Sequence, residues 1–442
     1  MPTAKRLFGT DGVRGKANVE LTVELAVDLA RAAGEGLGGP VIVGRDTRRS
    51  GDMLSLALQA GFHSVGVDTE DVGIIPTAAI AHLTVQSGAS MGAVVSASHN
   101  PAEDNGIKFF GGDGAKLSDQ LEDAIEARYR AGPPWKAPRS GTGMQIVRTG
   151  ALELYLDWLK ADASYSLRGL EVAVDAANGS AFMAAPRLFE ELGANVTAVA
   201  CEPDGLNIND GCGANHPEFL AGQIDGQIGV VLDGDADRFI AIDEGSVPLN
   251  GDVVMAIIAR YLHEQGRLKN NTVVVTVMSN LGFRRAMGDL GIKLIETAVG
   301  DRYVLEAMRE HKVNLGGEQS GHVIFLDHSF TGDGLLTALR LLEVVAATGK
   351  PLTELRQVMT EYPQVLRNVR VADKESLAGA EAIWEAVRET EQRLGDGGRV
   401  LIRPSGTEPV IRVMVEAGAK TEAAQTADDL AVVVRNALGE VP

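Results

Sequence analysis

Two short segments of the chain carry residue types suited to moving a phosphoryl group. The first, residues 96–101 with the sequence SASHNP, places the hydroxyl of Ser98 beside the imidazole of His99. A serine hydroxyl is a weak nucleophile and needs a base, a metal ion or several hydrogen-bond donors to exchange a phosphoryl group. A buried-strand pattern at 93–95 ends just before this segment, so Ser98 is predicted to lie on an exposed turn at a strand end. Taken alone, the segment also fits an ordinary turn serine.

The second segment is a candidate metal site. Asp233, Asp235 and Asp237 place three carboxylates at alternate positions, and this local charge is unfavourable unless a cation is bound. Oxygen ligands favour a hard ion, magnesium before calcium, and a phosphate oxygen on Ser98 would supply a further ligand. Arg238 would balance the excess negative charge.

A calcium-binding loop is the competing interpretation of this acidic segment, because Glu244 falls at its twelfth position. The sixth position of such a loop requires glycine, and here it is Arg238. The flanking residues 228–232 and 239–242 have the pattern of strands, whereas the calcium loop lies between helices. These differences favour magnesium.

Two further segments carry groups that bind anions or sugars. Residues 403–409, with the sequence RPSGTEP, form a candidate phosphate-binding loop without a Walker lysine, and an ordinary Pro/Gly turn is the alternative. Its candidate ligands are Arg403, Ser405, Gly406, Thr407 and Arg412. Residues 316–322, GGEQSGH, offer Glu318, Ser320 and His322 to a hydroxyl-rich ligand.

The elements that position these segments repeat along the chain. Units of strand, loop, helix and strand begin near residues 41, 172 and 272, with a helix at 53–61 and a strand near 65–67 in the first unit. They predict an α/β protein with three related α/β domains, followed by a smaller C-terminal α+β domain whose last helix spans about 422–438. The predicted domains are 1–145, 146–250, 251–363 and 364–442.

Composition restricts the function classes. The 442 residues are 45% hydrophobic and 23% charged, with a formal net charge of -19. This acidity argues against nucleic acid or an anionic membrane as a partner, so phosphates must be bound by local cations. Those cations are Arg14, Lys108, Arg238, Arg403 and Arg412. With no secretory signal pattern and no apolar run near 20 residues, a cytoplasmic location is expected, and Cys201 and Cys212 are interpreted as incidental thiols.

The motifs together resemble the α-D-phosphohexomutase family. They are FGTDGVRG at 8–15, the Ser98 loop, NGIK at 105–108, the Asp233 loop, the Glu318 loop and the Arg403 loop, and they occur in the family's order. The GEQSGH form of the sugar loop and TGDG at 331–334 favour the bacterial subgroup that interconverts glucosamine 6-phosphate and glucosamine 1-phosphate.

The resemblance implies an isomerase that works through a phosphoserine at Ser98, one Mg²⁺ and glucosamine 1,6-bisphosphate as activator and intermediate, and that supplies UDP-N-acetylglucosamine for cell-wall synthesis. One loop from each domain would meet in a central cleft. Arg14, His99, Lys108 and His322 would position groups or transfer protons, Glu318 and Ser320 would bind ring hydroxyls, and the Arg403 loop would hold the phosphate that does not react. A homodimer through the first domain is also implied.

Several alternatives stay open at this point. A phosphoglucomutase or phosphomannomutase would use the same residues, and no residue is recognisable as the acceptor for the carbon-2 amine. A metal-dependent sugar phosphatase would share Ser98 and the metal, and a non-catalytic sugar-phosphate sensor could share the fold. Many relatives have glycine where this chain has Ala236, a change expected to be tolerated if the residue avoids positive φ.

Overall fold

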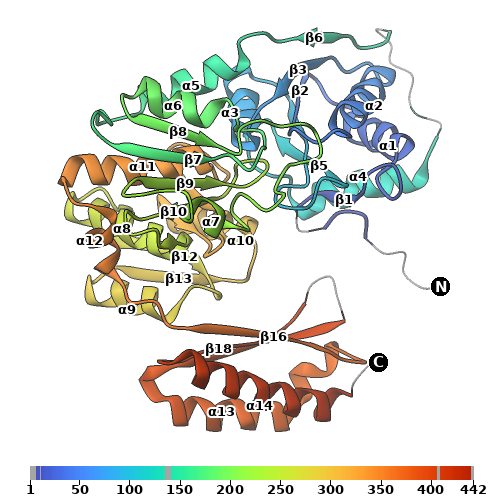
Figure 1. Ribbon diagram of the computed structural model, residues 1–442. Helices are drawn as coiled ribbons and strands as arrows, with labels where there is room; N and C mark the ends of the chain where they lie inside the picture. Colours follow the sequence, from blue (N-terminus) through green and yellow to red (C-terminus); the bar gives the residue numbers. More distant parts are fainter. Residues whose placement is uncertain (1–5, 10, 134, 136–140, 406–408, 440–442) are drawn as a thin grey trace. The chain divides into compact units, whose positions relative to one another are not determined.

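The computed structural model describes residues 6–9, 11–133, 135, 141–405 and 409–439 (Figure 1). The chain forms two compact units, one of Met1–Met278 with Ile292–Val358 and one of Ser279–Gly291 with Met359–Pro442. Among the described residues, no helix is long and apolar enough to cross a membrane. The domain boundaries at 145, 250 and 363 stay predictions.

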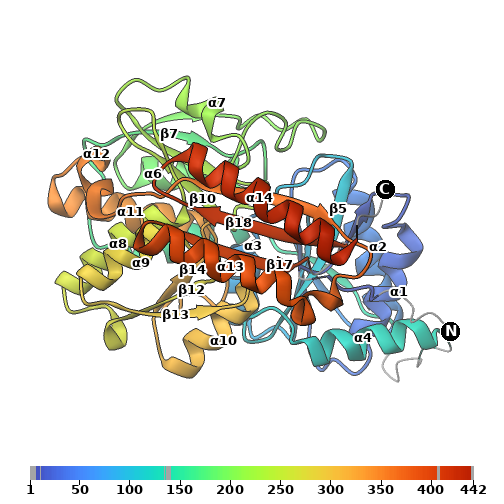
Figure 2. The same cartoon turned by 90° about the horizontal axis from the view of Figure 1, so that it is seen from below.

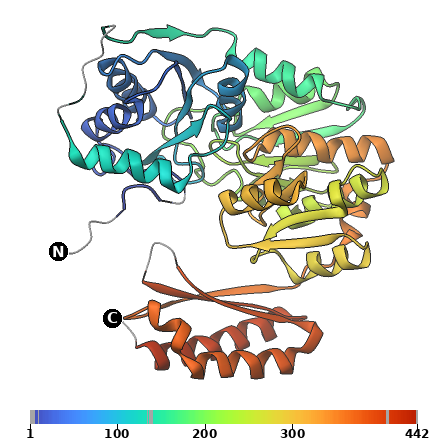
Figure 3. The same cartoon turned by 180° about the vertical axis from the view of Figure 1, so that it is seen from behind.

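The first sheet has six strands in the order β1-β5-β4-β2-β3-β6. Its strands are β1 (Val13–Lys16), β2 (Val41–Arg45), β3 (Thr69–Ile74), β4 (Met91–Val95), β5 (Asp104–Gly111) and β6 (Gln145–Val147). Helices α1 (Val23–Gly34), α2 (Gly51–Ser64) and α4 (Asp119–Ala131) share one apolar core with this sheet, and α3 (Thr77–Ser87) packs against β2 and β4. Figure 3 shows α1 and α4 side by side.

The second and third sheets lie in the same unit. The second has the order β11-β10-β9-β7-β8, and the third has the order β13-β12-β14-β15. Their strands are β7 (Glu171–Asp175), β8 (Asn195–Val199), β9 (Ile228–Leu232), β10 (Phe239–Ile242), β11 (Pro248–Leu249), β12 (Thr272–Thr276), β13 (Lys293–Thr297), β14 (Leu315–Gly317) and β15 (Val323–Phe325). The helices of this part are α5 (Ala151–Ala161), α6 (Ala184–Glu191), α7 (Pro217–Ala221), α8 (Gly251–Glu264), α10 (Asp301–His311), α11 (Gly334–Thr348) and α12 (Leu352–Leu355).

The three sheets place their functional loops at the same structural position. In each, a buried strand that pairs in parallel with a neighbour is followed by an antiparallel strand: β4 by β5, β9 by β10 and β14 by β15. The Ser98, Asp233 and Glu318 loops are these three connections. All residues of β4, β9 and β14 are buried, so each loop starts from an immobile base.

The second unit contains α9 (Leu281–Asp289) and a three-stranded antiparallel sheet with the order β16-β18-β17. Its elements are β16 (Gln364–Arg370), β17 (Arg399–Pro404), β18 (Val410–Glu416), α13 (Glu381–Leu394) and α14 (Lys420–Leu438). Figure 2 shows α13 and α14 side by side, and their apolar faces form one core with the sheet. The expected α+β character and last helix are confirmed, and α13 is an addition to them.

One predicted strand is wrong. Residues 65–67 form the turn after α2, and the strand that follows is β3, which begins at Thr69. The backbone N–H groups of Val65 and Val67 bond to the carbonyl of Phe62, and Gly66 has φ +81°, so this apolar segment closes a helix C-terminus.

Candidate active site

Ser98 lies on the predicted turn after β4, but its side chain is buried, so the expectation of an exposed serine is wrong. Only 1% of Ser98 is exposed, because the loop that follows β9 covers it. Its Oγ donates a hydrogen bond to Oδ2 of Asp233, and Nδ1 of His99 lies 3.3 Å from the same Oγ. The backbone has φ +53°, a left-handed conformation that a non-glycine residue adopts only when its surroundings impose it.

A buried ion pair imposes that conformation. Arg48 and Asp46 pair at 2.9 Å with fully buried side chains. The guanidinium of Arg48 donates to the carbonyls of Ser98 (2.9 Å), Asn100 (2.8 Å), Pro101 and Asp104 (3.0 Å). A planar group with five donors is suited to several carbonyls that converge on one point.

The partner carboxylate completes the clamp. Asp46 accepts a hydrogen bond from the Ser96 hydroxyl at 2.5 Å, and Ser96 Oγ accepts from the backbone N–H of Ser98 at 2.9 Å. Burial raises the pKa of Asp46, although the Arg48 charge opposes this effect. Removing either charged group would leave the other buried without its counter-ion.

The Ser98 loop is also held from the second sheet. The Nδ2 of Asn209 donates to the carbonyls of Ser98 (2.9 Å) and Asn100 (3.0 Å). A Cβ atom at Gly234 would lie 2.6 Å from the Ser98 carbonyl oxygen, closer than any ordinary contact. The two loops therefore approach each other at a point where only glycine fits.

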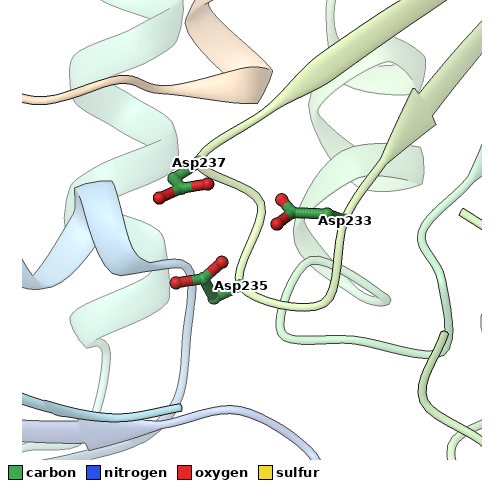
Figure 4. Close-up of side chains that lie close together, drawn as sticks. All are labelled: Asp233, Asp235 and Asp237. Atoms are coloured by element: carbon green, nitrogen blue, oxygen red, sulfur yellow. The ribbon is translucent and has the colours of Figure 1, made fainter. Parts of the chain in front are cut away.

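The three aspartates form a compact buried cluster (Figure 4). Each of Asp233, Asp235 and Asp237 offers a carboxylate oxygen, and these oxygens lie within 4.8 Å of one another. Among the described residues, Oδ1 of Asp235 and Oδ1 of Asp237 are buried without a hydrogen-bond partner. Burial and then repulsion from the other two carboxylates raise the pKa of Asp233 well above its usual range. Unpartnered oxygens and mutual repulsion both fit a site for a divalent cation.

The α3 helix fixes this cluster from the first sheet. The hydroxyl of Thr77 donates to Oδ2 of Asp235 at 2.7 Å, and its backbone N–H donates to the Asp235 carbonyl at 3.0 Å. Ala236 has φ +58°, so the condition under which alanine was expected to be tolerated in place of glycine, the absence of a positive φ, is not met. The left-handed residue makes the tight turn that brings the three carboxylates together.

The structure also bears on the calcium-loop alternative. Glu244 does not join the aspartate cluster, because its carboxylate accepts the backbone N–H groups of Leu352 (2.8 Å) and Thr353 (3.0 Å) at the start of α12. The strands β9 and β10 flank the loop, as predicted.

Lys108 links the aspartate cluster to the N-terminal motif. Its Nζ lies 2.9 Å from Oδ2 of Asp235 and 2.9 Å from Oδ2 of Asp11. Burial would lower the pKa of Lys108, but Asp11, Asp235 and Asp237 outweigh it and raise the pKa above its ordinary value. The condition under which Lys108 would act as a general base, a lowered pKa, is therefore not met by these contacts.

A second lysine extends the network. Lys116 lies 2.6 Å from Oδ1 of Asp11 and 2.7 Å from Oδ2 of Asp301. Arg14 also pairs with Asp11 and donates to Oδ1 of Asn100 at 3.2 Å, so the N-terminal motif touches the Ser98 loop.

The two histidines have different environments. Burial, together with the charges of Arg238 and Arg14, lowers the pKa of His99 to about 4, so this imidazole is neutral near pH 7. His322 is buried, with Nδ1 at 3.5 Å from Oδ2 of Asp237, and its Nε2 accepts the backbone N–H of Gly332 at 2.9 Å.

The Glu318 loop and Arg238 lie beside this network. Glu318 accepts the backbone N–H of Gly300 at 3.2 Å, and burial raises the pKa of Glu318. Ser320 is exposed, and the backbone N–H of Arg238 donates to Oδ1 of Asp233 at 3.2 Å. Of the predicted site residues, nine lie in this unit and meet around one point: Arg14, Ser98, His99, Lys108, Asp233, Asp235, Asp237, Arg238 and His322, with Glu318 and Ser320 on the loop next to them.

The candidate phosphate loop belongs to the second unit. Arg403 and Arg412 are directly opposite each other on β17 and β18, and burial, followed by the Arg412 charge, lowers the pKa of Arg403. Two guanidinium groups at one register position favour a bound anion. Ser405 is buried, whereas Gly406 and Thr407 lie outside the described residues.

Several residues that organise the site had no predicted functional role: Asp11, Asp46, Arg48, Thr77, Lys116, Asn209 and Asp301. One signal was available, since Asp46 and Arg48 are charged residues that follow closely on the apolar run VIVG at 41–44. Charged residues are rarely fully buried unless they are paired.

Family comparisons cover almost the whole chain. Four models of the phosphoglucomutase/phosphomannomutase family match: α/β/α domain I at 5–134, domain II at 153–246, domain III at 250–362 and the C-terminal domain at 366–433. A phosphoglucosamine mutase of Carboxydothermus hydrogenoformans is 50% identical over 441 residues, which cover 97% of this chain and 99% of that protein.

Solved structures agree with this match. A phosphoglucomutase/phosphomannomutase family protein of Burkholderia thailandensis is similar with a TM-score of 0.82 and 25% identity, over 98% of this chain and 97% of the other. An N-acetylphosphoglucosamine mutase of Aspergillus fumigatus, in complex with GlcNAc-6P and magnesium, shares the fold with a TM-score of 0.70 and 20% identity, over 98% and 96% of the two chains.

Proposed function

Because the chain belongs to the phosphoglucomutase/phosphomannomutase family, we propose that it is an isomerase that interconverts glucosamine 6-phosphate and glucosamine 1-phosphate. The observation that carries the chemistry is the Ser98 hydroxyl, which donates to Asp233 within a cluster of three buried aspartates. The 50% identity to a phosphoglucosamine mutase supports the choice of substrate.

In the proposed reaction Ser98 carries a phosphoryl group in the resting enzyme. The free hydroxyl of the sugar monophosphate attacks this phosphorus, the P–Oγ bond breaks, and the hydroxyl proton ends on Oγ of Ser98. The product is glucosamine 1,6-bisphosphate, which reorients and returns its other phosphoryl group to Ser98 by the reverse step. The two transfers restore the phosphoserine, so the reaction needs no ATP.

The residues around Ser98 have distinct roles in this scheme. Asp233, Asp235 and Asp237 would hold one Mg²⁺, which supplies charge neutralisation at the transferring group. His99 is neutral near pH 7 and lies 3.3 Å from Oγ, so we assign it to the proton on the serine. Lys108 stays a cation, which suits it to stabilise negative charge.

The remaining predicted residues bind and orient the sugar phosphate. Glu318 and Ser320 bind ring hydroxyls, and Arg14, Arg238 and His322 position the reacting groups. Arg403, Ser405, Gly406, Thr407 and Arg412 hold the phosphate that does not react. Holding the distal phosphate in either orientation lets one site serve both ends of the sugar.

Phosphorus NMR with Mg²⁺ and a trace of bisphosphate tests the proposal. Glucosamine 6-phosphate, glucose 6-phosphate and mannose 6-phosphate are supplied in parallel, and we expect by far the highest kcat/KM for glucosamine 6-phosphate. A preference for the glucose or mannose ester would indicate a phosphoglucomutase or phosphomannomutase. Free phosphate that appears faster than isomerisation would indicate a sugar phosphatase.

The Ser98→Ala variant separates the phosphoserine mechanism from any other. We expect it to lose turnover and to keep sugar-phosphate binding, measured by calorimetry. An active Ser98→Ala variant would contradict the phosphoserine mechanism. If the variant folds and binds the sugar phosphate but does not turn over, a purely structural role for Ser98 is excluded.

We also propose that the enzyme acts in the cytoplasm, where its product would supply UDP-N-acetylglucosamine, and that it forms a homodimer through the first domain. The strand β6 at the edge of the first sheet supports a contact there, since Ile146 and Val147 on this strand and Met144 just before it are exposed apolar residues. Light scattering that gives the mass of a single chain at micromolar concentration would contradict the dimer.

A further inference from the structure

The charge network has one side that is open to solvent. The side chains of Lys108 and Asp235 are 2% and 1% exposed, whereas those of Lys116, Asp301 and Asp11 are 12%, 14% and 22% exposed. A ligand that enters the site therefore meets Lys116, Asp301 and Asp11 before the enclosed metal cluster.

Among these groups Asp301 is the carboxylate with the least compensated charge. Its Oδ2 pairs with Lys116 at 2.7 Å, and within the described part of the chain its Oδ1 accepts one hydrogen bond, from the backbone N–H of Arg302 at 2.9 Å. Lys116 is shared with Asp11, which has Lys108 and Arg14 as further cations. Asp301 thus pairs with one lysine, which it shares with Asp11, whereas Asp11 pairs with three cations.

His322 lies near Oδ2, the oxygen of Asp301 that already pairs with Lys116. Its Nε2 lies 3.4 Å from Oδ2 of Asp301, but the same nitrogen accepts the backbone N–H of Gly332 at 2.9 Å. A carboxylate oxygen can accept two hydrogen bonds, and Oδ1 of Asp301 accepts one from the described residues. Asp301 therefore keeps capacity for one more donor, which a cationic group can supply.

Asp301 is also next to the sugar loop. The residue before it, Gly300, donates its N–H to Oε1 of Glu318 at 3.2 Å. If Glu318 binds a ring hydroxyl, a substituent on the adjacent ring carbon lies within reach of Asp301.

We propose that Asp301 accepts a hydrogen bond from the ammonium group at carbon-2 of the substrate and so distinguishes glucosamine phosphate from glucose phosphate. This inference rests on the proposed function, and it assigns a protein partner to the carbon-2 amine, for which the sequence offered no recognisable acceptor. A hydroxyl can also donate to a carboxylate, so the difference between the two sugars comes from the charge of the ammonium, and we expect discrimination of about 10- to 100-fold.

The first test compares kcat/KM for glucosamine 6-phosphate and glucose 6-phosphate in wild type and in Asp301→Asn. Asparagine keeps the shape and an oxygen acceptor for Lys116 but removes the negative charge. We expect the ratio of the two kcat/KM values to fall at least 10-fold. The control Glu318→Gln changes a group that contacts both sugars, so it should lower both values in parallel and leave the ratio within about threefold.

The second test uses the wild type alone and does not depend on the folding of a variant. The ratio of kcat/KM for glucosamine 6-phosphate to kcat/KM for glucose 6-phosphate should fall as the pH rises and the sugar amine loses its proton. The midpoint of this fall should lie near the ordinary α-amino pKa of about 7.7–8.0. The protein groups that face this position, Lys116, Asp11, Glu318 and His322, act on both sugars and cancel in the ratio.

The outcomes are distinguishable. A preference for glucosamine phosphate that survives Asp301→Asn, or a ratio that does not change with pH, overturns this inference and leaves the proposed function intact. A wild-type enzyme with no preference for the amino sugar overturns the proposed substrate, and the inference fails with it.

Discussion

Replacing Arg48 should unfold the enzyme more easily and slow it at the same time. In Arg48→Met the carboxylate of Asp46 stays buried without its counter-ion, and the loss of one partner of a buried pair costs about 3–5 kcal/mol. The carbonyls of Ser98, Asn100, Pro101 and Asp104 also lose a charged donor. We therefore expect the free energy of unfolding of the larger unit to fall by about 3–5 kcal/mol.

The effect on catalysis follows from the backbone of Ser98. Its φ of +53° is held by these bonds, and release of the loop would move Oγ relative to Asp233. A displacement of about 1 Å at a reacting group lowers the rate about 100-fold, so we expect kcat to fall by that order. Arg48→Lys keeps the charge beside Asp46 and should recover about half of the stability, but its ammonium cannot reach all four carbonyls, so kcat should stay at least 10-fold low.

Urea denaturation and steady-state kinetics measure the two effects. The matched control is Arg49→Met, which removes the same charge from the adjacent exposed residue and should change the free energy of unfolding by less than about 0.5 kcal/mol. If Arg48→Met unfolds within 1 kcal/mol of the wild type, the clamp does not stabilise the fold as argued. If its kcat stays within twofold, the clamp does not position Ser98.

Three further predictions concern other parts of the chain. Gly234→Ala should lower kcat at least 10-fold, because the new Cβ atom would lie 2.6 Å from the Ser98 carbonyl oxygen. The control Gly288→Ala has open space around the added Cβ and should keep the wild-type kcat; equal kcat values for the two variants would refute the close approach. Chelation of divalent cations should abolish turnover and lower the melting temperature, because the three aspartates then repel one another without a bound cation. Added Mg²⁺ should restore both quantities, and a chelated enzyme that stays active would exclude the metal site. His82 stacks on Trp158 at 4.2 Å, and burial lowers the pKa of His82 to about 4, so the unfolded chain binds a proton that the folded chain does not as pH falls from 6.5 towards 4. The free energy of unfolding should therefore fall by about 1–2 kcal/mol over this range, after allowance for the partial exposure of the ring. Urea titrations of His82→Gln should lack this part of the pH dependence, and an unchanged dependence would contradict the prediction.

The sequence predicted those site residues that are close together in the chain. Asp233, Asp235 and Asp237 cluster because they share one turn, and Ser98 with His99 shares another. The strands that precede the two turns, β4 and β9, were recognisable because they are wholly apolar.

The parts that were missed depend on which loops meet in space. Arg48 lies 50 residues from Ser98, and Lys116 is far in sequence from Asp301, so neither contact leaves a local pattern. The prediction that Ser98 is exposed was wrong for the same reason, because the residues that cover it come from the loops of the second sheet. The left-handed conformation of Ala236 was not predicted, because a local propensity argument cannot include the hydrogen bonds that hold the turn.

The shared position of the Ser98, Asp233 and Glu318 loops has a consequence for how such an enzyme can change. Each loop is a short connection between two paired strands, so its residues can be exchanged without altering the register of the sheet beneath it. A single scaffold position thus holds the proposed nucleophile, the proposed metal ligands and the proposed sugar-binding residues in three successive copies. Substrate preference can drift in the third copy while the bond-making parts in the first two stay fixed, which makes residues 318–322, with the neighbouring 300–301, the natural place to randomise in a search for new sugar specificity.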